Sequence, residues 1–542
     1  MRSAEREKIY KTLKLHDMWL NGEDGGGKAD LSGADLRNLN LRGRNLSYVN
    51  LSGANLEGAN LADANLSGAN LSGAKLCGAV PANATLVGTD FTGADMTGAN
   101  LFNAILRTAI LRESDLSGAD LTDADLSGTD LYRANFRDSL LCGAKLCDAK
   151  ADKTDMRNAK LRGADLREMR LDAGNLVGAD LRDANLSGAV LNETNLSGAD
   201  FYKSNLRGVV FCKCDFAGAD LSGVDLSGAG DLTTNRFENA NLSHANLYRA
   251  ELKGVDMEKA NLRGARMNQA NMRGIGLSGA DLSGANLCDV MLEGATLRGA
   301  KLNNAELSWS NLRSIDLTDA DLTCAKMVAV KLNIANLSGA VMSAVNLTSS
   351  NFTEACLGET KLNEADLHLG KFNGAIMRGA DLREANMTSC DLSKTDLPGA
   401  DLRGTDLTRA KFDGANLSGV IQDAGTKIDE PAHELDTGMD LIGYARNIAK
   451  ICLGDGVIVT NAQPGRTYEG EIISVHESGR NKLAVMALAE DRAILHDLRD
   501  DGAISGLEEG KTATLVTDAE GYGSVKDRAA ETQSHTREGM KR

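Results

Sequence analysis

The sequence predicts an all-β solenoid: a chain wound into a long coil, with a short helix before it and a small β-rich domain after it. Leu, Phe or Met recurs at every fifth residue over most of the chain, usually with a small residue two positions before it and Gly two positions after it. Aromatic residues make up only 4% of the 542 residues. A biased composition with a strict period is the sign of a repeat architecture.

The first 28 residues are predicted to form a helical cap on the first coil. Residues 3–20 carry helical signals, and the three glycines at 25–27 follow as a hinge. The residues behind this prediction are Ser3 as N-cap, Ile9, Leu13 and Trp19 on one apolar side, and Asn21-Gly22 as the stop. A helix that binds a partner is the alternative that remains open.

The repeat itself runs from Leu31 to Leu226 with two exceptions, Pro81 and Ala151. It then slips by one residue at 227–231 and resumes from Leu232 to Leu417, and the unit is A-(D/N)-L-(S/R/T)-G. Five residues advance an α-helix by about 500°, which would spread the Leu residues over all faces. An odd spacing on a continuous strand would send them to alternate faces.

A short extended piece followed by a corner fits this period. The small residue and the Leu, two apart, then point inward together, and Gly at the corner can adopt a positive φ. The small residue is needed because a second large side chain in each pentad would overfill a narrow interior. The coil therefore has Leu and Ala inside and polar residues outside.

On this unit, residues 29–420 resemble the pentapeptide-repeat proteins. The resemblance implies a right-handed quadrilateral β-helix with four pentads in each turn. The 78 pentads would then make nearly 20 coils, and stacking at roughly 4.8 Å would give a rod about 95 Å long.

Three irregularities interrupt the repeat. Pro81 replaces a core Leu, so the coil at 79–85 is expected to be loose, and Ala151 is expected to leave a void unless Met156 or a neighbour fills it. The slip at 227–231 is expected to bulge one corner and to bend the rod or form a ledge. Structural imperfection is the preferred interpretation of all three.

After the repeat the composition changes. Residues 421–440 contain Pro431 and many charges and are predicted to be a linker, whereas residues 441–524 are predicted to form a small β-barrel-like domain that starts with a helix at 441–450. The polar tail at 525–542 is predicted to be disordered. The expected strands are 457–460, 467–475, 482–488, 493–498 and 512–516.

Within this domain, residues 465–498 are similar to the domain named after the plasmid protein KfrB. The similarity lies in Gly465, Tyr468, Gly470 and Ile472, and in the later pair Leu495-His496. It implies a setting in plasmid maintenance or conjugation and no reaction. A cyclic-dinucleotide receptor is disfavoured because 446–450 only half-matches the required arginine pair.

The sequence predicts no catalytic, cofactor-binding or metal-binding residue. Cys142 and Cys147 are five apart as the repeat dictates, and the spacing of Cys212 and Cys214 suits no metal site, so reduced thiols in a cytoplasmic protein are expected. A metal pair of His476 and His496 is disfavoured because no third ligand is evident. No apolar run is long enough to span a membrane.

These observations leave three functional hypotheses. The leading one is a non-enzymatic scaffold or spacer for protein–protein contacts, with a protein partner and an oligomeric state that the sequence does not identify. The resemblance also implies a DNA-mimicking gyrase binder, but the net charge over 31–420 is only −8, far below that of DNA. The third is plasmid maintenance through the C-terminal domain, whose net charge of −8 over 421–542 disfavours direct DNA contact.

Overall fold

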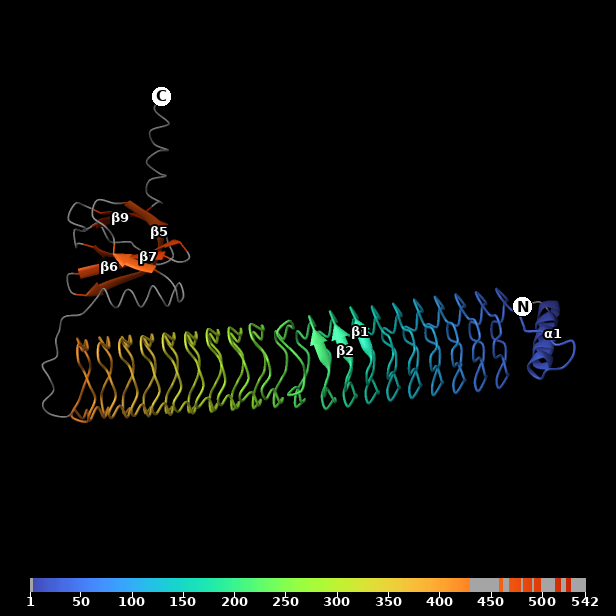
Figure 1. Ribbon diagram of the computed structural model, residues 1–542, viewed down its shortest axis with the longest axis horizontal. Coiled ribbons are helices and arrows are strands. Elements are labelled where there is room, and N and C mark those ends of the chain that lie inside the picture. Colours follow the sequence, from blue (N-terminus) through green and yellow to red (C-terminus); the bar gives the residue numbers. More distant parts are fainter. Residues whose placement is uncertain are drawn as a thin grey trace, which may run out of the picture. The chain divides into compact units, whose positions relative to one another are not determined.

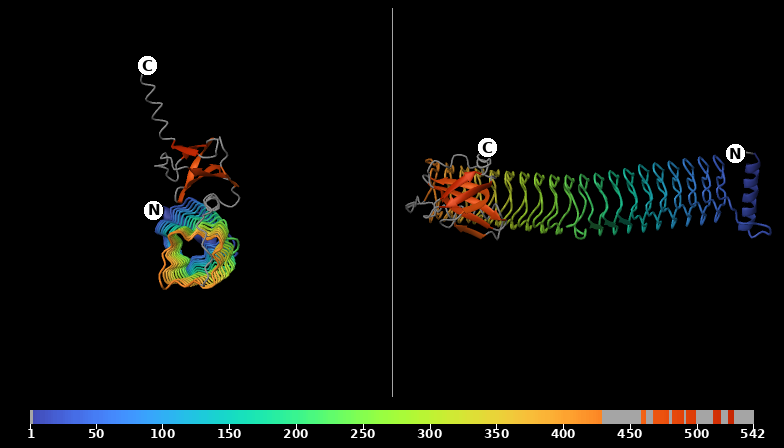
Figure 2. Two further views of the ribbon diagram at one scale, coloured as in Figure 1. Left: turned by 90° about the vertical axis from the view of Figure 1, so that its left-hand side faces the viewer. Right: turned by 90° about the horizontal axis from the view of Figure 1, so that it is seen from above.

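The computed structural model describes residues 3–428 and six strands between residues 458 and 527. It divides into two compact units, Met1–Leu307 and Ser308–Arg542. Each unit contains stacked coils of the repeat, which have a four-sided outline when viewed end-on (Figure 2).

Helix α1 spans Ser3–Leu20, as predicted. It ends with Gly22 at φ 71° and with a hydrogen bond from the Glu23 N–H to the Met18 carbonyl at 2.9 Å. The chain then turns back so closely that a Cβ at Gly26 would lie 2.3 Å from the Trp19 nitrogen. Glycine at this position is therefore a steric requirement of the turn rather than a flexible hinge.

Each side of a coil is one pentad with a tight turn. The Ala34 N–H donates to the Leu31 carbonyl at 3.1 Å, and Gly33 has a φ of 64°. A positive φ at the third residue of the turn is the signature of type II geometry. Non-glycine residues occupy the same position in many pentads with φ near 55–60°, for example Asp123 at 57°.

Parallel pairing between coils fixes the pitch at 20 residues. The Leu31 N–H donates to the Asn50 carbonyl at 2.8 Å, and the Asn50 N–H donates to the Ala29 carbonyl at 3.1 Å. This pattern continues through both units, so four pentads make one turn. The Leu and Ala positions point inward and are buried, as Leu56 and Ala59 show.

In three consecutive coils of the first unit one side forms short strands (Figure 1). These are β1 (Arg170–Asp172), β2 (Val190–Asn192) and β3 (Val210–Cys212), paired in parallel in the order β1-β2-β3. Here the residue after the core residue stays extended, whereas the other pentads pair through single-residue bridges.

Pro81 keeps its place in the core. It is buried, and its turn is intact because the Ala84 N–H donates to the Pro81 carbonyl at 3.1 Å. Proline has no N–H, however, and within the described residues the Asn100 carbonyl receives no ladder bond from it. The irregularity therefore removes one ladder hydrogen bond.

The void expected at Ala151 is a small cavity in the neighbouring interior that Ala151 itself does not line. Ala151 is fully buried, and a small apolar cavity of about 10 Å³ in this part of the interior is lined by Met156, Leu171, Leu191 and neighbouring core residues. The cavity is about the volume of a single water probe, and its apolar lining gives a water no partner.

The slip at 227–231 lengthens one corner and does not interrupt the stack. The pairing distance changes from 20 to 21 residues, as in Asp215↔Arg236, and returns to 20 at Arg236↔Asp256. The exposed residues Ser227, Gly228 and Asp231 lie in this longer corner. The ladder therefore continues on both sides of the slip.

The ladder also continues beyond residue 420, where the sequence analysis ended it. Ile421 pairs with Asp401, and Lys427 pairs with Asp406 at a spacing of 21 residues. The part of the predicted linker from 429 to 440 and the helix predicted at 441–450 lie outside the described residues.

The C-terminal strands form a six-stranded sheet among the residues described there, in the order β4-β7-β6-β5-β8-β9, with an additional pairing of β7 with β9 (Figure 1). Most pairs are antiparallel, and β4–β7 and β7–β9 are parallel. β9 ends three residues into the segment predicted to be a disordered tail, and the rest of that segment is outside the described residues. The strands are β4 (Ile458–Asn461), β5 (Thr467–Ser478), β6 (Asn481–Ala489), β7 (Arg492–Leu498), β8 (Thr512–Thr517) and β9 (Gly523–Asp527).

Candidate interaction surfaces

The Asp and Asn residues on the outer walls have a structural role. The Asp90 carboxylate accepts a hydrogen bond from the Thr92 N–H at 2.9 Å, and Asn50 accepts one from the Ser52 N–H at 3.2 Å. These are Asx turns, in which a short side chain satisfies the main chain two residues later. The geometry explains why Asp or Asn precedes the core residue in most pentads.

The same side chains also connect neighbouring coils. The Asn135 amide donates to Asp115 at 2.9 Å, and the Asn386 amide donates to Asp366 at 2.9 Å, each across 20 residues. An aspartate can only accept in such a row, so each Asn above an Asp adds a bond that Asp above Asp could not make.

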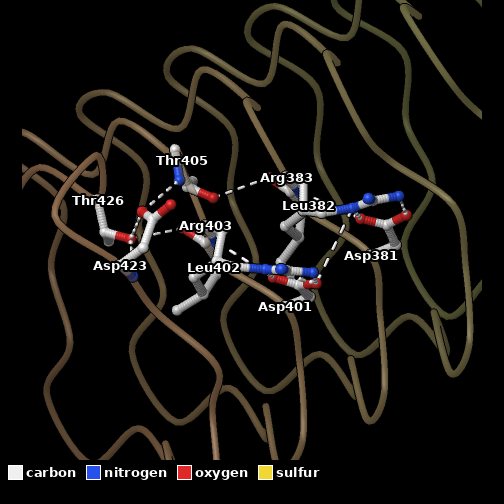
Figure 3. Close-up of polar contacts among 10 residues, drawn as sticks. Asp381, Leu382, Arg383, Asp401, Leu402, Arg403, Thr405, Asp423 and Thr426 are labelled. Atoms are coloured by element: carbon white, nitrogen blue, oxygen red, sulfur yellow. Dashed lines mark hydrogen bonds and ion pairs between the residues drawn. The ribbon is translucent and has the colours of Figure 1, made fainter.

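Several arginines that follow the core residue pair with the carboxylate of their own pentad. Arg383 forms two bonds with Asp381 at 2.8 and 2.7 Å, and Arg403 binds Asp401 in the same way (Figure 3). The hydrogen bonds from Arg383 and Arg403 hold the pKa of Asp381 and Asp401 below the usual range. The negative charges of Asp381 and Asp401 are therefore compensated by the arginines beside them.

The corner after Gln422 is held by Asp423 and Thr426. The Asp423 carboxylate accepts hydrogen bonds from the Gly404 and Gly425 N–H groups, both at 3.0 Å. The Thr426 hydroxyl donates to the Leu402 carbonyl at 2.8 Å. The bonds from the Gly404 and Gly425 N–H groups lower the pKa of Asp423.

The corner at 227–235 uses a different side chain. Asn235 occupies a position that is usually Ala, is only 3% exposed, and accepts from the Cys214 N–H at 2.8 Å. Its amide donates to the Phe211 carbonyl at 3.3 Å, and the Thr234 hydroxyl accepts from the Lys213 N–H at 2.9 Å. The role of Asn235 was not predicted from the sequence, although Asn at a position that is usually Ala was a signal.

Helix α1 is attached to the first coil through its second half. Leu13 is buried there as predicted, whereas Trp19 is 39% exposed and packs edge-on against Tyr48 with ring centroids 6.4 Å apart. His16, whose role was not predicted from the sequence, is fully buried and accepts a hydrogen bond from the Ala29 N–H at 3.1 Å through Nδ1. Burial lowers the pKa of His16, so the imidazole is neutral.

Beside the first half of α1 lies a groove of about 390 Å³. Its walls come from α1 and from the first side of the first coil. The lining residues are Glu5, Lys8, Ile9 and Thr12 of the helix, and Asp30, Leu31, Ser32, Gly33, Ala34 and Asp35 of the coil.

The two buried cysteines among the described residues, Cys214 and Cys390, lack the features of reactive thiols. Burial raises the pKa of Cys214 to about 11 and that of Cys390 to about 12, so neither is a nucleophile at neutral pH. Cys142 and Cys147 are free, as is Cys212. In the C-terminal sheet, His476 pairs with Leu483 and His496 pairs with Ala484, so β6 lies between the two histidine strands.

Within the described part of the chain no cluster of His, Cys, Asp and Glu is suited to a metal ion. No helix described there has the length and apolar character needed to cross a membrane. Some large apolar side chains are nevertheless exposed on the coils, for example Trp309 at 68% and Leu369 at 48%.

These features define a class: a β-solenoid whose regular walls are built from hydrogen-bonded corners. The pentapeptide repeat family model matches in many copies between residues 28 and 421, well over half of the chain. The chain therefore belongs to the pentapeptide repeat family, whose fold is a right-handed quadrilateral β-helix, and the predicted family is confirmed.

Several solved pentapeptide repeat structures are similar to parts of the chain. HetL of Nostoc sp. PCC 7120 is 27% identical over 48% of this chain and 90% of its own length, with a TM-score of 0.12. Rfr23 of Cyanothece 51142 is 36% identical over 18% and 64%, with a TM-score of 0.13. A thylakoid-lumen protein of Arabidopsis thaliana is 30% identical over 19% and 69%, with a TM-score of 0.16. No curated protein matches the chain.

Proposed function

We propose that this protein is a non-enzymatic scaffold or spacer that binds other proteins through the walls and ends of its coils. The observation that carries the proposal is the state of the surface side chains. They form repeated rows of Asx turns and Arg–Asp pairs, as at Asp381 and Arg383, which fix the main chain and leave a regular, mixed-charge wall. Such a wall suits broad contact with a protein better than enclosure of a substrate.

The C-terminal strands suit a separate binding module. The pairing of Leu498 with Gly523 connects β7 with β9, and this supports a small closed or nearly closed β-barrel. The similarity of residues 465–498 to the KfrB domain supports a role beside plasmid or conjugation proteins in the cytoplasm. In this proposal the solenoid spaces the module from whatever the coils bind.

Mimicry of DNA is the weaker candidate. A DNA mimic needs a dense and uncompensated row of negative charge. Here Arg383 and Arg403 pair with the carboxylates beside them, as do Arg167 and Arg182 in the first unit. We expect no inhibition of gyrase supercoiling at micromolar protein, and inhibition would reverse this ranking.

The scaffold proposal is tested by cross-linking the full-length protein to the partners that it captures, followed by mass-spectrometric mapping of the linked residues. Cross-links from coil lysines such as Lys253 and Lys301 to one recurrent partner are expected. Turnover of a substrate by the purified protein, or links confined to residues after 457, would contradict the role given to the coils.

A further inference from the structure

We propose that the groove between α1 and the first coil binds an extended segment of a partner protein, which carries an apolar side chain next to a Lys or Arg. The segment would add to the open edge of the first coil as one further pentad. This inference rests on the interaction role proposed above and assigns it a surface and a class of partner.

The main chain at the edge of the first coil is ready to pair. In later coils, the residue before the core residue exchanges hydrogen bonds with the preceding coil, as Asn50 does with Ala29 and Leu31. Asp30 and Asp35 hold this position in the first coil, and within the described residues their N–H and C=O groups have no partner. An unpaired edge of this kind accepts an extended chain by strand addition.

The apolar floor of the groove lies beside this edge. Ile9 and Leu31 are each 7% exposed, whereas the next core residues Leu36 and Leu41 are 0 and 2% exposed. An added pentad would place its own inward-pointing residue over Leu31, as each later coil does for the one before it. The groove therefore favours a segment with one apolar side chain at this point.

The charged residues around the groove favour one kind of side chain next to the apolar residue of the bound segment. Glu5, Asp30 and Asp35 line it, against one cation, Lys8. Arg37 binds Asp35 and holds the pKa of that carboxyl near 2. Asp30 instead accepts from the neutral Ser32 N–H and Asn50 amide, at 3.0 and 2.9 Å. Its charge is thus uncompensated by any ion pair among the described residues, and a Lys or Arg of the segment would complement it.

The dimensions agree with one pentad. Asp30 and Asp35 are five residues apart, so the open edge between them is one pentad long. The volume of about 390 Å³ accommodates a few side chains. The second half of α1, held by His16 and by the ion pair of Asp17 with Arg44 at 3.3 Å, closes the rest of the coil end.

The test uses fluorescein-labelled peptides and the full-length protein in a polarisation titration. The probe is AKLSGAKLSG, and its charge-reversed counterpart AELSGAELSG is the control peptide. We expect saturable binding of the basic peptide and at least tenfold weaker binding of the acidic one. Thr12→Trp, which fills the groove, should weaken binding at least tenfold, and Lys14→Trp on the exposed side of α1 should leave it unchanged.

Asp30→Asn is the second variant, because Asn holds the equivalent position in the next coil and preserves the Asx turn. This variant should bind the basic peptide several-fold more weakly, and the difference in affinity between the basic and the acidic peptide should become smaller. Hydrogen exchange of α1 in the Thr12→Trp variant verifies that the helix stays docked on the first coil. If the helix undocks in that variant, the peptide binding of Asp30→Asn alone tests the proposal. Absence of binding at millimolar peptide, or equal binding by wild type and Asp30→Asn, would overturn the proposal. Partner capture that persists in Thr12→Trp would overturn the groove alone and leave the scaffold role standing.

Discussion

Two corners of the solenoid contain one residue more than a pentad. Different side chains replace the main-chain hydrogen bonds of the regular repeat in each of them. The corner at 227–235 changes the pairing to Asp215↔Arg236, and the corner at 421–427 changes it to Asp406↔Lys427. In the first corner the buried Asn235 binds the N–H of Cys214. In the second corner the surface carboxylate of Asp423 binds the N–H of Gly404, while Thr426 binds the Leu402 carbonyl.

The comparison shows what an insertion requires of a β-solenoid. A longer corner moves main-chain carbonyls away from the N–H groups that they would pair with, so polar side chains must supply the missing partners. Inside the coil water cannot substitute, whereas at the surface it can. The two corners should therefore respond very differently to loss of their polar side chains.

The largest effect is expected for Asn235→Ala. The Cys214 N–H and the Phe211 carbonyl lose their partner in the interior, which costs about 3 kcal/mol of local stability. Hydrogen exchange of the peptides covering 206–240 measures this loss. Asn268→Ala is the matched control, because the Asn268 side chain makes no hydrogen bond among the described residues, and equal effects of the two changes would contradict the role of Asn235.

Asp423→Ala should cost less than Asn235→Ala, because water can reach the Gly404 and Gly425 N–H groups. Faster exchange is expected at residues 402–428, with no change in the first unit. The pKa of Asp423 is lowered in the folded state, so the stabilisation from its carboxylate is fully present at pH values above the ordinary pKa of an Asp. This stabilisation is lost as the pH falls through the folded-state pKa. Asp413→Ala, on an exposed residue, is the control and should leave exchange unchanged.

Pro81→Leu tests a position where no side chain compensates. The new N–H can bond to the Asn100 carbonyl, and the change should stabilise the surrounding coils by about 1 kcal/mol. We expect amide hydrogen exchange to become slower at Asn100 and its neighbours. Unchanged or faster exchange would mean that the restriction proline places on the unfolded chain outweighs the missing bond.

The smallest effect is expected from protonation of His16 and is confined to the docking of α1. In the docked helix His16 Nδ1 accepts from the Ala29 N–H, in the place of a main-chain acceptor. Burial lowers the pKa of His16, so docking of α1 is strongest above the ordinary pKa of about 6.5 and weakens as pH falls below it. Emission of Trp19 in a Trp309→Phe background should shift between pH 7 and 5. The shift should be absent in His16→Gln, and a shift of equal size there would assign the transition to another group.

Much of this architecture followed from the sequence because its cause is local. The five-residue period predicted the corners, the inward Leu and Ala, and the family to which the chain belongs. The helix at 3–20 was predicted from its caps and apolar side. Strand β9 was missed because Gly523–Asp527 has only one strong strand former, Val525. It is a strand because it pairs with β8, and that pairing is set by the tertiary structure.

The sequence by itself determined the coil, because each pentad specifies its own turn and its own inward side chains. Only the tertiary structure decided how the chain departs from that rule: that Asn235 serves the ladder from within, that His16 receives the Ala29 N–H, and that Asp30 and Asp35 remain open at the first edge. The physical reason is that main-chain partners in this fold lie on neighbouring coils or elements: the bonds of Asn235 and His16 join residues 21 and 13 apart, and Asp30 and Asp35 have no coil before them. These partners are set by the stacking of whole coils and not by any local pattern.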